Sequence, residues 1–155
     1  IRDVAVATMA QLNGGAARAM RRVGVSAATD VTGFGLLGHL SEMVRSSRVS
    51  ATIDYAAVPV LPGAAKLAAD GIVPGGTRRN LATAERYTKF GDLDPAGRLL
   101  LADAQTSGGL LLTVEAPLVN ALLQALDDED ASGTVIGRIT DREFSDGPAG
   151  VIKIR

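Results

Sequence analysis

The sequence predicts an α+β fold in which a mixed β-sheet is flanked by helices. Segments with apolar residues at helical spacing alternate with short apolar segments of strand length, and glycine and proline separate them. The last two strand segments follow one another across a turn-rich stretch, which predicts a hairpin rather than a regular parallel arrangement. Because no period of 20 to 50 residues repeats, the 155 residues are expected to form a single domain, 1–155.

The first third of the chain predicts helix, strand and helix. Apolar residues recur at helical spacing over residues 4–23, but Gly14 and Gly15 interrupt them, so either one broken helix or two short helices is expected. Residues 25–31, VSAATDV, have the length and character of a buried strand. A helix follows, and one face of it carries apolar residues, namely Phe34, Leu37, Leu40, Met43 and Val44.

The rest of the chain alternates in the same way. Residues 49–55 alternate like a half-buried strand, and Pro62 and Gly71 bound the next helix. Residues 72–80 have loop composition, whereas Asp94 and Pro95 are the N-cap and first turn of a short helix. The remaining predicted elements are an apolar strand at 108–114, a helix from 117, and strands at 134–139 and 150–154 that residues 140–150 join.

Composition excludes several function classes. A net charge of −1, a pI near 5.8 and 3% aromatic residues argue against nucleic-acid binding, and no apolar run is long enough for a membrane span. The absence of cysteine excludes thiol chemistry and is compatible with a cytoplasmic location, and one histidine is too few for a histidine metal cluster. The chain starts without methionine or a signal-peptide pattern, so we expect it to be part of a longer protein.

Two similar glycine-rich segments carry the chemistry. The first glycine turn is TDVTGFG, residues 29–35, and the second is DAQTSGG, residues 103–109. Glycine lets backbone N–H groups approach an anion, and the carboxylate of Asp30 suits Mg²⁺, which binds one or two carboxylates with phosphate oxygens and water. A nucleoside triphosphate with magnesium is therefore the indicated ligand. Ordinary structural turns use the same residue types, and neither segment is a Walker loop or a dinucleotide fingerprint.

Five blocks in order resemble the carboxy-terminal half of the selenophosphate synthetase (selenide, water dikinase) family. They are MAQLN at 9–13, ATDVTGFGLLGHLSEM at 28–43, VPGGTRRN at 73–80, DAQTSGGLLL at 103–112 and VIGRI at 135–139. The aminoimidazole ribonucleotide synthetase superfamily shares the two turns, and its carboxy-terminal domain is the fold that the resemblance implies. The long first block is typical of the selenium family in particular.

The resemblance implies an ATP-dependent enzyme that makes selenophosphate, AMP and phosphate from ATP, selenide and water. In this family the enzyme is a homodimer, and the amino-terminal half of the same chain supplies most of the ATP site and the catalytic residues. No catalytic residue is expected in this chain, which should be inactive by itself. Asp30 matches the family's Mg²⁺ ligand. The residues that match the ATP-site turns are Thr29, Asp30, Thr32, Gly33, Gln105, Thr106, Ser107, Gly108 and Gly109.

Several alternatives remain open. His39 is expected to be a packed or capping histidine, and Arg78 and Arg79 either contact phosphate or form a solvated pair. Methionines 9, 20 and 43 have spacing suited to packing, whereas Ala28 and Ala104 stand where many relatives have Cys and Pro. An ADP-forming superfamily relative, such as a cyclo-ligase or thiamine monophosphate kinase, and a non-catalytic dimer-supporting module are the competing functions.

Overall fold

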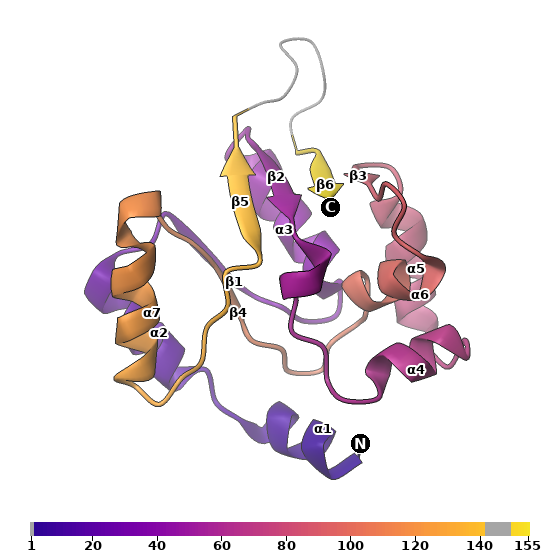
Figure 1. Cartoon of the computed structure of the whole chain (residues 1–155), viewed down its shortest axis with the longest axis horizontal. Coiled ribbons are helices and arrows are strands. Elements are labelled where there is room, and N and C mark those ends of the chain that lie inside the picture. Colours follow the sequence, from indigo (N-terminus) through magenta and orange to yellow (C-terminus); the bar gives the residue numbers. More distant parts are fainter. Residues whose placement is uncertain (1, 142–149) are drawn as a thin grey trace.

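The structure is a computed structural model that describes residues 2–141 and 150–155 (Figure 1). Helices and strands are intermixed along the chain, and the α+β class is confirmed. The helices are α1 (Arg2–Ala10), α2 (Gly14–Val23), α3 (Gly35–Ser46), α4 (Ala64–Ala69), α5 (Gly75–Ala84), α6 (Pro95–Leu101) and α7 (Val119–Asp127). The strands are β1 (Ala27–Asp30), β2 (Ser50–Ile53), β3 (Thr88–Lys89), β4 (Leu110–Thr113), β5 (Gly137–Thr140) and β6 (Ile152–Ile154). None of these helices is long and apolar enough to cross a membrane.

The strands form two sheets rather than one. β1 and β4 pair antiparallel as a separate two-stranded ladder, and a four-stranded sheet has the order β3-β6-β2-β5. The larger sheet is mixed, because β2 pairs antiparallel with β5 but parallel with β6, and β3 pairs parallel with β6. In Figure 1 the β1–β4 ladder lies between the α2–α7 pair on one side and α3 with the larger sheet on the other.

The predicted hairpin of the last two strands is wrong. β2 lies between β5 and β6, so that Ala51 has Ile139 as its partner on one side and Ile152 on the other. A central position suits β2, since Ala51 and Ile53 are almost fully buried, and β6 contributes the buried Ile152 and Ile154 beside them. Strands close in sequence pair readily as a hairpin, but burying these apolar side chains around β2 stabilises the observed order more. Most of the predicted connecting turn, residues 142–149, lies outside the described residues.

Residues 72–80 are not a loop throughout, because α5 begins at Gly75. Pro74 precedes the first turn in an extended conformation, and Gly75 and Gly76 occupy that turn despite their low helix propensity. Thr77 and Ala84 are fully buried on the inner face of α5, so tertiary packing overrides the local composition. β3 was not predicted from the sequence, because a strand of two residues is too short to show an alternating pattern.

Two apolar clusters support the fold. The larger one joins α3 to the four-stranded sheet through residues that include Leu37, Leu40 and Val44. The smaller one lies between α2 and α7, which Figure 1 shows side by side. Phe34 was predicted on the buried face of α3, but it precedes the helix and is 60% exposed. The buried face therefore begins at Leu37, and Phe34 is an exposed residue of the first glycine turn.

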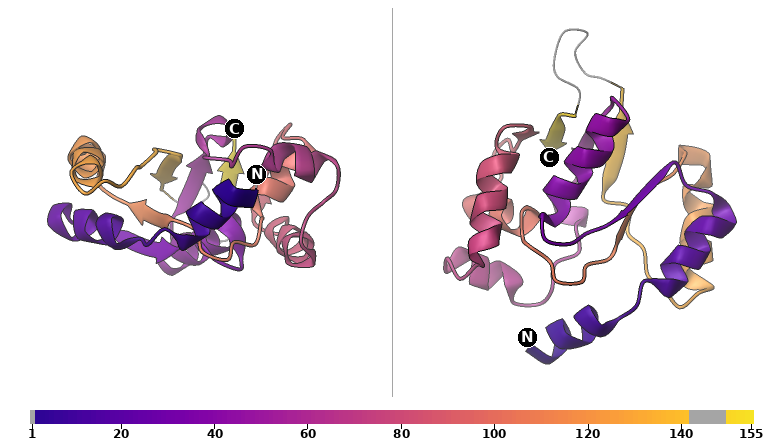
Figure 2. Two further views of the ribbon diagram at one scale, coloured as in Figure 1. Left: turned by 90° about the horizontal axis from the view of Figure 1, so that it is seen from below. Right: turned by 180° about the vertical axis from the view of Figure 1, so that it is seen from behind.

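The amino-terminal segment forms two helices, in agreement with the break predicted at Gly14 and Gly15. α1 has no buried residue, and the right-hand view in Figure 2 shows it extending away from the rest of the chain. Met9 is 43% exposed, so its predicted packing role is not met within the described residues, whereas Met20 and Met43 are half-buried. Apolar spacing alone did not indicate that α1 lacks a surface to pack on here.

Burial in the larger sheet predicts that an Ile→Val substitution lowers the free energy of unfolding by an amount that depends on its position. Ile152→Val is expected to lower the free energy of unfolding by about 0.5–1.5 kcal/mol, because the deleted methylene leaves a cavity at a site with no solvent exposure. Ile139→Val is the matched control, since Ile139 in β5 is 41% exposed and the change should stay within about 0.5 kcal/mol. Urea unfolding of both variants measures the difference, and equal costs would contradict the assigned burial.

Candidate functional site

The two glycine turns lie side by side. β1 ends at Asp30, directly before most of the first turn, and β4 begins at Leu110, directly after the second. Because the two strands are antiparallel and Asp30 pairs with Leu110, both turns emerge at the same end of the ladder. The sequence showed that the two turns are alike, and the strand pairing brings them together.

Backbone hydrogen bonds tie the turns to each other. Val31 N–H donates to Gly109 O at 3.0 Å, Gly108 N–H donates to Val31 O at 3.1 Å, and Gln105 N–H donates to Thr32 O at 3.0 Å. Gly108 is required in this arrangement, since a Cβ there would collide with the carbonyl oxygen of Val31. Backbone hydrogen bonds therefore join the two turns into one connected unit.

Asp30 lies at the open edge of this unit. β1 was predicted to be buried, but Ala28 and Asp30 are exposed and alternate with half-buried Ala27 and Thr29. The hydroxyl of Thr29 donates to the carbonyl of Asp30 at 3.2 Å. Across residues 2–141 and 150–155, the Asp30 carboxylate takes part in no hydrogen bond or ion pair. The acid is thus an exposed carboxylate with its oxygens available to a ligand.

Gly33 and Gly109 leave backbone uncovered next to that carboxylate. At both positions an added Cβ would meet nothing within 4 Å, so these glycines border open space. α3 starts two residues after Gly33, and no side chain caps its first turn. Backbone N–H groups at such a helix start attract anions through the helix dipole. The surface combines one carboxylate with backbone donors, which is the pair of groups that a magnesium-bound phosphate needs.

His39 is buried beneath the first turn and contacts two of its residues. Its ring is buried, its Nε2 lies 3.1 Å from the hydroxyl of Thr32, and it contacts the Phe34 ring at a centroid distance of 5.6 Å. The structure therefore agrees with the packed role expected of this histidine. The Thr32 hydroxyl is partly engaged inside the protein, and only its remaining hydrogen-bonding capacity can serve a ligand.

The second turn presents its residues unequally. Thr106 and Gly109 are exposed, whereas Gln105, Ser107 and Gly108 are half-buried. The side-chain amide of Gln105 donates to Asp103 Oδ2 at 2.8 Å and so faces the protein. Of the five residues that the resemblance indicated here, Thr106 and the backbone of Gly109 are the most accessible.

Four residues that sequence reasoning did not assign to the site hold the turns in place. The amide of Asn13 donates to Gly108 O at 3.0 Å, and that of Asn80 donates to Gly33 O at 2.8 Å. The hydroxyl of Thr77 donates to the carboxylate of Asp103, the first residue of the second turn, at 2.7 Å. Asn13, Thr77 and Asn80 belong to blocks that carried the family resemblance, and this is the signal that could have found them.

The paired arginines on α5 differ. Arg78 donates from its guanidinium to the carbonyl of Gly71 at 2.8 Å and so links α5 to the end of α4. This contact supports a structural role for Arg78 over a phosphate contact. Arg79 is exposed, and its side chain forms no hydrogen bond or ion pair within residues 2–141 and 150–155, so both alternatives stay open for it.

The described residues contain no cluster of three or more His, Cys, Asp or Glu side chains that could hold a metal ion. Asp30 therefore offers one carboxylate and no more. A single carboxylate fits Mg²⁺ only when phosphate oxygens, water or other protein groups complete its octahedral shell. The donor set is suited to a shared magnesium site and not to a self-contained one.

Comparisons with known proteins identify the family of this chain. Residues 3–147 match the family described as AIR synthase related protein, C-terminal domain. The chain is 42% identical over 153 residues to a selenide, water dikinase of Cronobacter sakazakii, covering 99% of this chain and 43% of the relative. For the proteins of that name from Porphyromonas gingivalis and Escherichia coli, the identities are 41% and 40%, over 91% and 98% of this chain.

The chain spans less than half the length of these relatives, covering 41–43% of them. The motif-based resemblance is confirmed, because these similarities extend over nearly the whole chain and are not confined to the two turns. The chain belongs to the AIR synthase related proteins, as their carboxy-terminal domain.

Proposed function

We propose that this chain is the carboxy-terminal half of an ATP-dependent selenophosphate synthetase. The observation that carries the proposal is the pairing of two glycine turns beside one exposed carboxylate, in a chain about 40% identical to selenide, water dikinases. The proposed reaction converts ATP, selenide and water to selenophosphate, AMP and phosphate. The turns contact the phosphates, and an amino-terminal half of the same polypeptide supplies the other wall of the site.

Asp30 is the residue proposed to hold Mg²⁺. When bound, the ion would offset the negative charge of the phosphate oxygens and favour phosphoryl transfer. Asp30 would hold the ion through its carboxylate, and the exposed backbone at Gly33 and Gly109 would allow phosphate oxygens to approach closely. Thr29, Thr32, Thr106 and Ser107 carry the hydroxyls of the same turns. Those of Thr29 and Thr32 already bond to Asp30 O and to His39, so Thr106 and Ser107 are the neutral donors proposed to serve the phosphates. Gln105 and Gly108 are proposed to shape the second turn.

The rest of the proposal concerns the whole protein. Since no side chain of this chain is assigned a proton-transfer or nucleophilic role, the isolated chain should lack activity. We propose that the enzyme is a cytoplasmic homodimer. The family resemblance implies the homodimer, and the absence of cysteine is compatible with a reducing compartment.

A ³¹P NMR experiment tests the function. The full-length protein is incubated anaerobically with Mg·ATP, with and without selenide, and the isolated 155-residue chain serves as the control. We expect a selenide-dependent selenophosphate resonance together with AMP and phosphate, and none of them from the control. Release of ADP would instead indicate an ADP-forming relative such as a cyclo-ligase or thiamine monophosphate kinase. Absence of any ATP turnover would favour a non-catalytic, dimer-supporting module.

A further inference from the structure

α5 connects both glycine turns through its inner face. Thr77 and Asn80 are three residues apart and so lie on the same side of the helix. Asn80 reaches the first turn and Thr77 reaches the second, although these segments are far from α5 in sequence. A single rigid element therefore contacts the two halves of the candidate site.

Asn80 holds the first turn by its side-chain amide. Its nitrogen donates to Gly33 O at 2.8 Å and to Ala102 O at 3.1 Å. The two acceptors belong to the first turn and to the residue after α6, so one amide links these segments. Gly35 also packs against this segment. Its backbone lies so close to Ala102 that an added Cβ would be 2.7 Å from the carbonyl carbon of Ala102.

Thr77 holds the second turn through Asp103. The fully buried Thr77 hydroxyl donates to Asp103 Oδ1 at 2.7 Å and accepts from the backbone N–H of Ala104 at 3.2 Å. Asp103 Oδ2 accepts from the Gln105 amide at 2.8 Å. Both carboxylate oxygens thus have a donor, which fixes the plane of the carboxylate and the start of the second turn.

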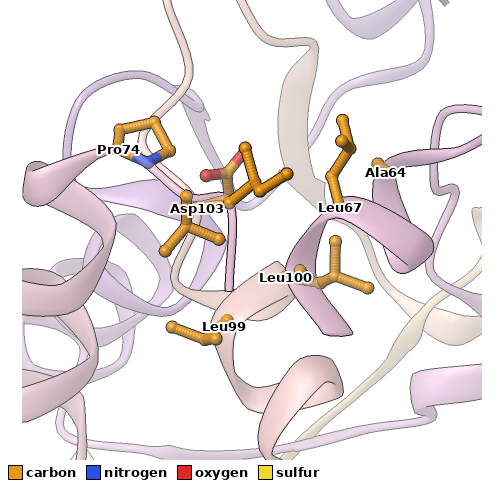
Figure 3. A pocket seen from close by; sticks show the side chains of 9 residues that line it. Ala64, Leu67, Pro74, Leu99, Leu100 and Asp103 are labelled. Atoms are coloured by element: carbon orange, nitrogen blue, oxygen red, sulfur yellow. The ribbon is translucent and has the colours of Figure 1, made fainter. Parts of the chain in front are cut away.

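The surroundings of Asp103 strengthen these bonds. Asp103 borders a cavity of about 160 Å³, and Figure 3 shows its carboxylate among the apolar side chains of Pro74, Leu67, Leu99 and Leu100. Apolar walls reduce competition from water for the hydrogen bonds of the carboxylate. Thr77, Asn80 and Asp103 are named here the α5 clamp.

We propose that the α5 clamp sets the distance and orientation between the two glycine turns, with Thr77 and Asn80 as positioning residues for Mg·ATP phosphates. The inference rests on the proposed function, because it assigns the clamp to the phosphate site. Backbone donors act on a phosphate only when they converge on it, and a displacement of about 1 Å can cost about 100-fold in rate. The clamp keeps the turns converged without touching the substrate.

The first experiment uses Thr77→Val in the full-length protein, at a temperature where circular dichroism shows it folded. Val keeps the shape of Thr but removes the hydroxyl, so kcat at saturating Mg·ATP should fall about 10- to 100-fold. The KM for Mg·ATP should change by less than about threefold, because most ground-state contacts remain. Thr77→Ser retains the hydroxyl and should restore most of kcat.

Thr83→Val is the matched control. Thr83 lies on the same helix, but it is exposed and its hydroxyl donates to Arg79 O within α5. Both kcat and KM should therefore keep wild-type values. Asn80→Ala is the second variant if Thr77→Val does not fold, and the same loss of kcat is expected because the first turn is then released. Wild-type kcat in folded Thr77→Val or Asn80→Ala would overturn the inference.

Hydrogen exchange on the 155-residue chain tests the clamp independently of activity. The amides of Gln105 and Gly108 donate across the two turns, so they should exchange about tenfold faster in Thr77→Val than in Thr83→Val. Equal exchange would mean that Thr77 does not hold the turns. If the wild-type enzyme forms ADP in the product assay, the proposed reaction fails, while the exchange result still decides whether the clamp exists.

Discussion

Asp30→Asn in the full-length protein is expected to lower kcat by at least about 100-fold. Loss of a residue that only supports a metal ligand typically costs 10- to 100-fold, and Asp30 is proposed as a ligand itself. The amide is neutral and binds Mg²⁺ weakly, so a higher Mg²⁺ concentration should be needed for half-maximal activity. Selenide-dependent AMP formation over a Mg²⁺ titration measures both effects.

The free energy of unfolding of Asp30→Asn distinguishes a loss of metal binding from misfolding. The Asp30 side chain is exposed and lacks a partner within the described part of the chain, so its replacement should change the free energy of unfolding by less than about 0.5 kcal/mol. Asp92→Asn is the matched control, because Asp92 is also exposed but lies outside both turns. Near-normal turnover by Asp30→Asn, with Asp92→Asn also active, would refute the metal role.

Gly35→Ala should destabilise the protein by about 2–5 kcal/mol. Gly35 has φ of +69°, a conformation that costs other residues about 1–2 kcal/mol. A Cβ there would also lie 2.7 Å from the carbonyl carbon of Ala102 and 2.8 Å from Asp103 O. Since these neighbours are backbone atoms, relief requires α3 and the end of α6 to separate, at an overpacking cost of about 1–3 kcal/mol.

Gly33→Ala is the control for this effect. It lies two residues earlier in the same turn, its φ is not positive, and an added Cβ meets no atom within 4 Å. Its free energy of unfolding should stay within about 0.5 kcal/mol of wild type. Urea unfolding of both variants checks the comparison. A destabilised Gly33→Ala, or a Gly35→Ala as stable as wild type, would contradict the distinct roles assigned to these glycines.

Local patterns were sufficient for several elements. The apolar face Leu37, Leu40 and Val44 predicted α3, and Asp94 does cap α6, since its carboxylate accepts from Gly97 N–H at 2.8 Å. Such features depend on residues a few positions apart, and the sequence states those spacings directly. The two glycine turns were recognisable for the same reason.

Other elements depended on distant contacts. α5 begins with Gly75 and Gly76, so its helical state follows from the burial of Thr77 and Ala84 against the rest of the fold. β5 and β6 join opposite edges of β2 instead of each other, because the buried Ala51 and Ile53 make β2 the central strand. Neither outcome is encoded by local propensity, which tertiary packing overrides.

The sequence by itself determined the α+β class and the residue types of the two turns, and it predicted Asp30, between Thr29 and Thr32, as the metal ligand. Only the tertiary structure decided that β1 and β4 pair, so that Asp30 faces Leu110 and the two turns form one unit. It also decided that Asn80 contacts a carbonyl 47 positions away in sequence. The physical reason is that residue type and spacing define what a group can bind, whereas strand pairing and burial define which groups meet.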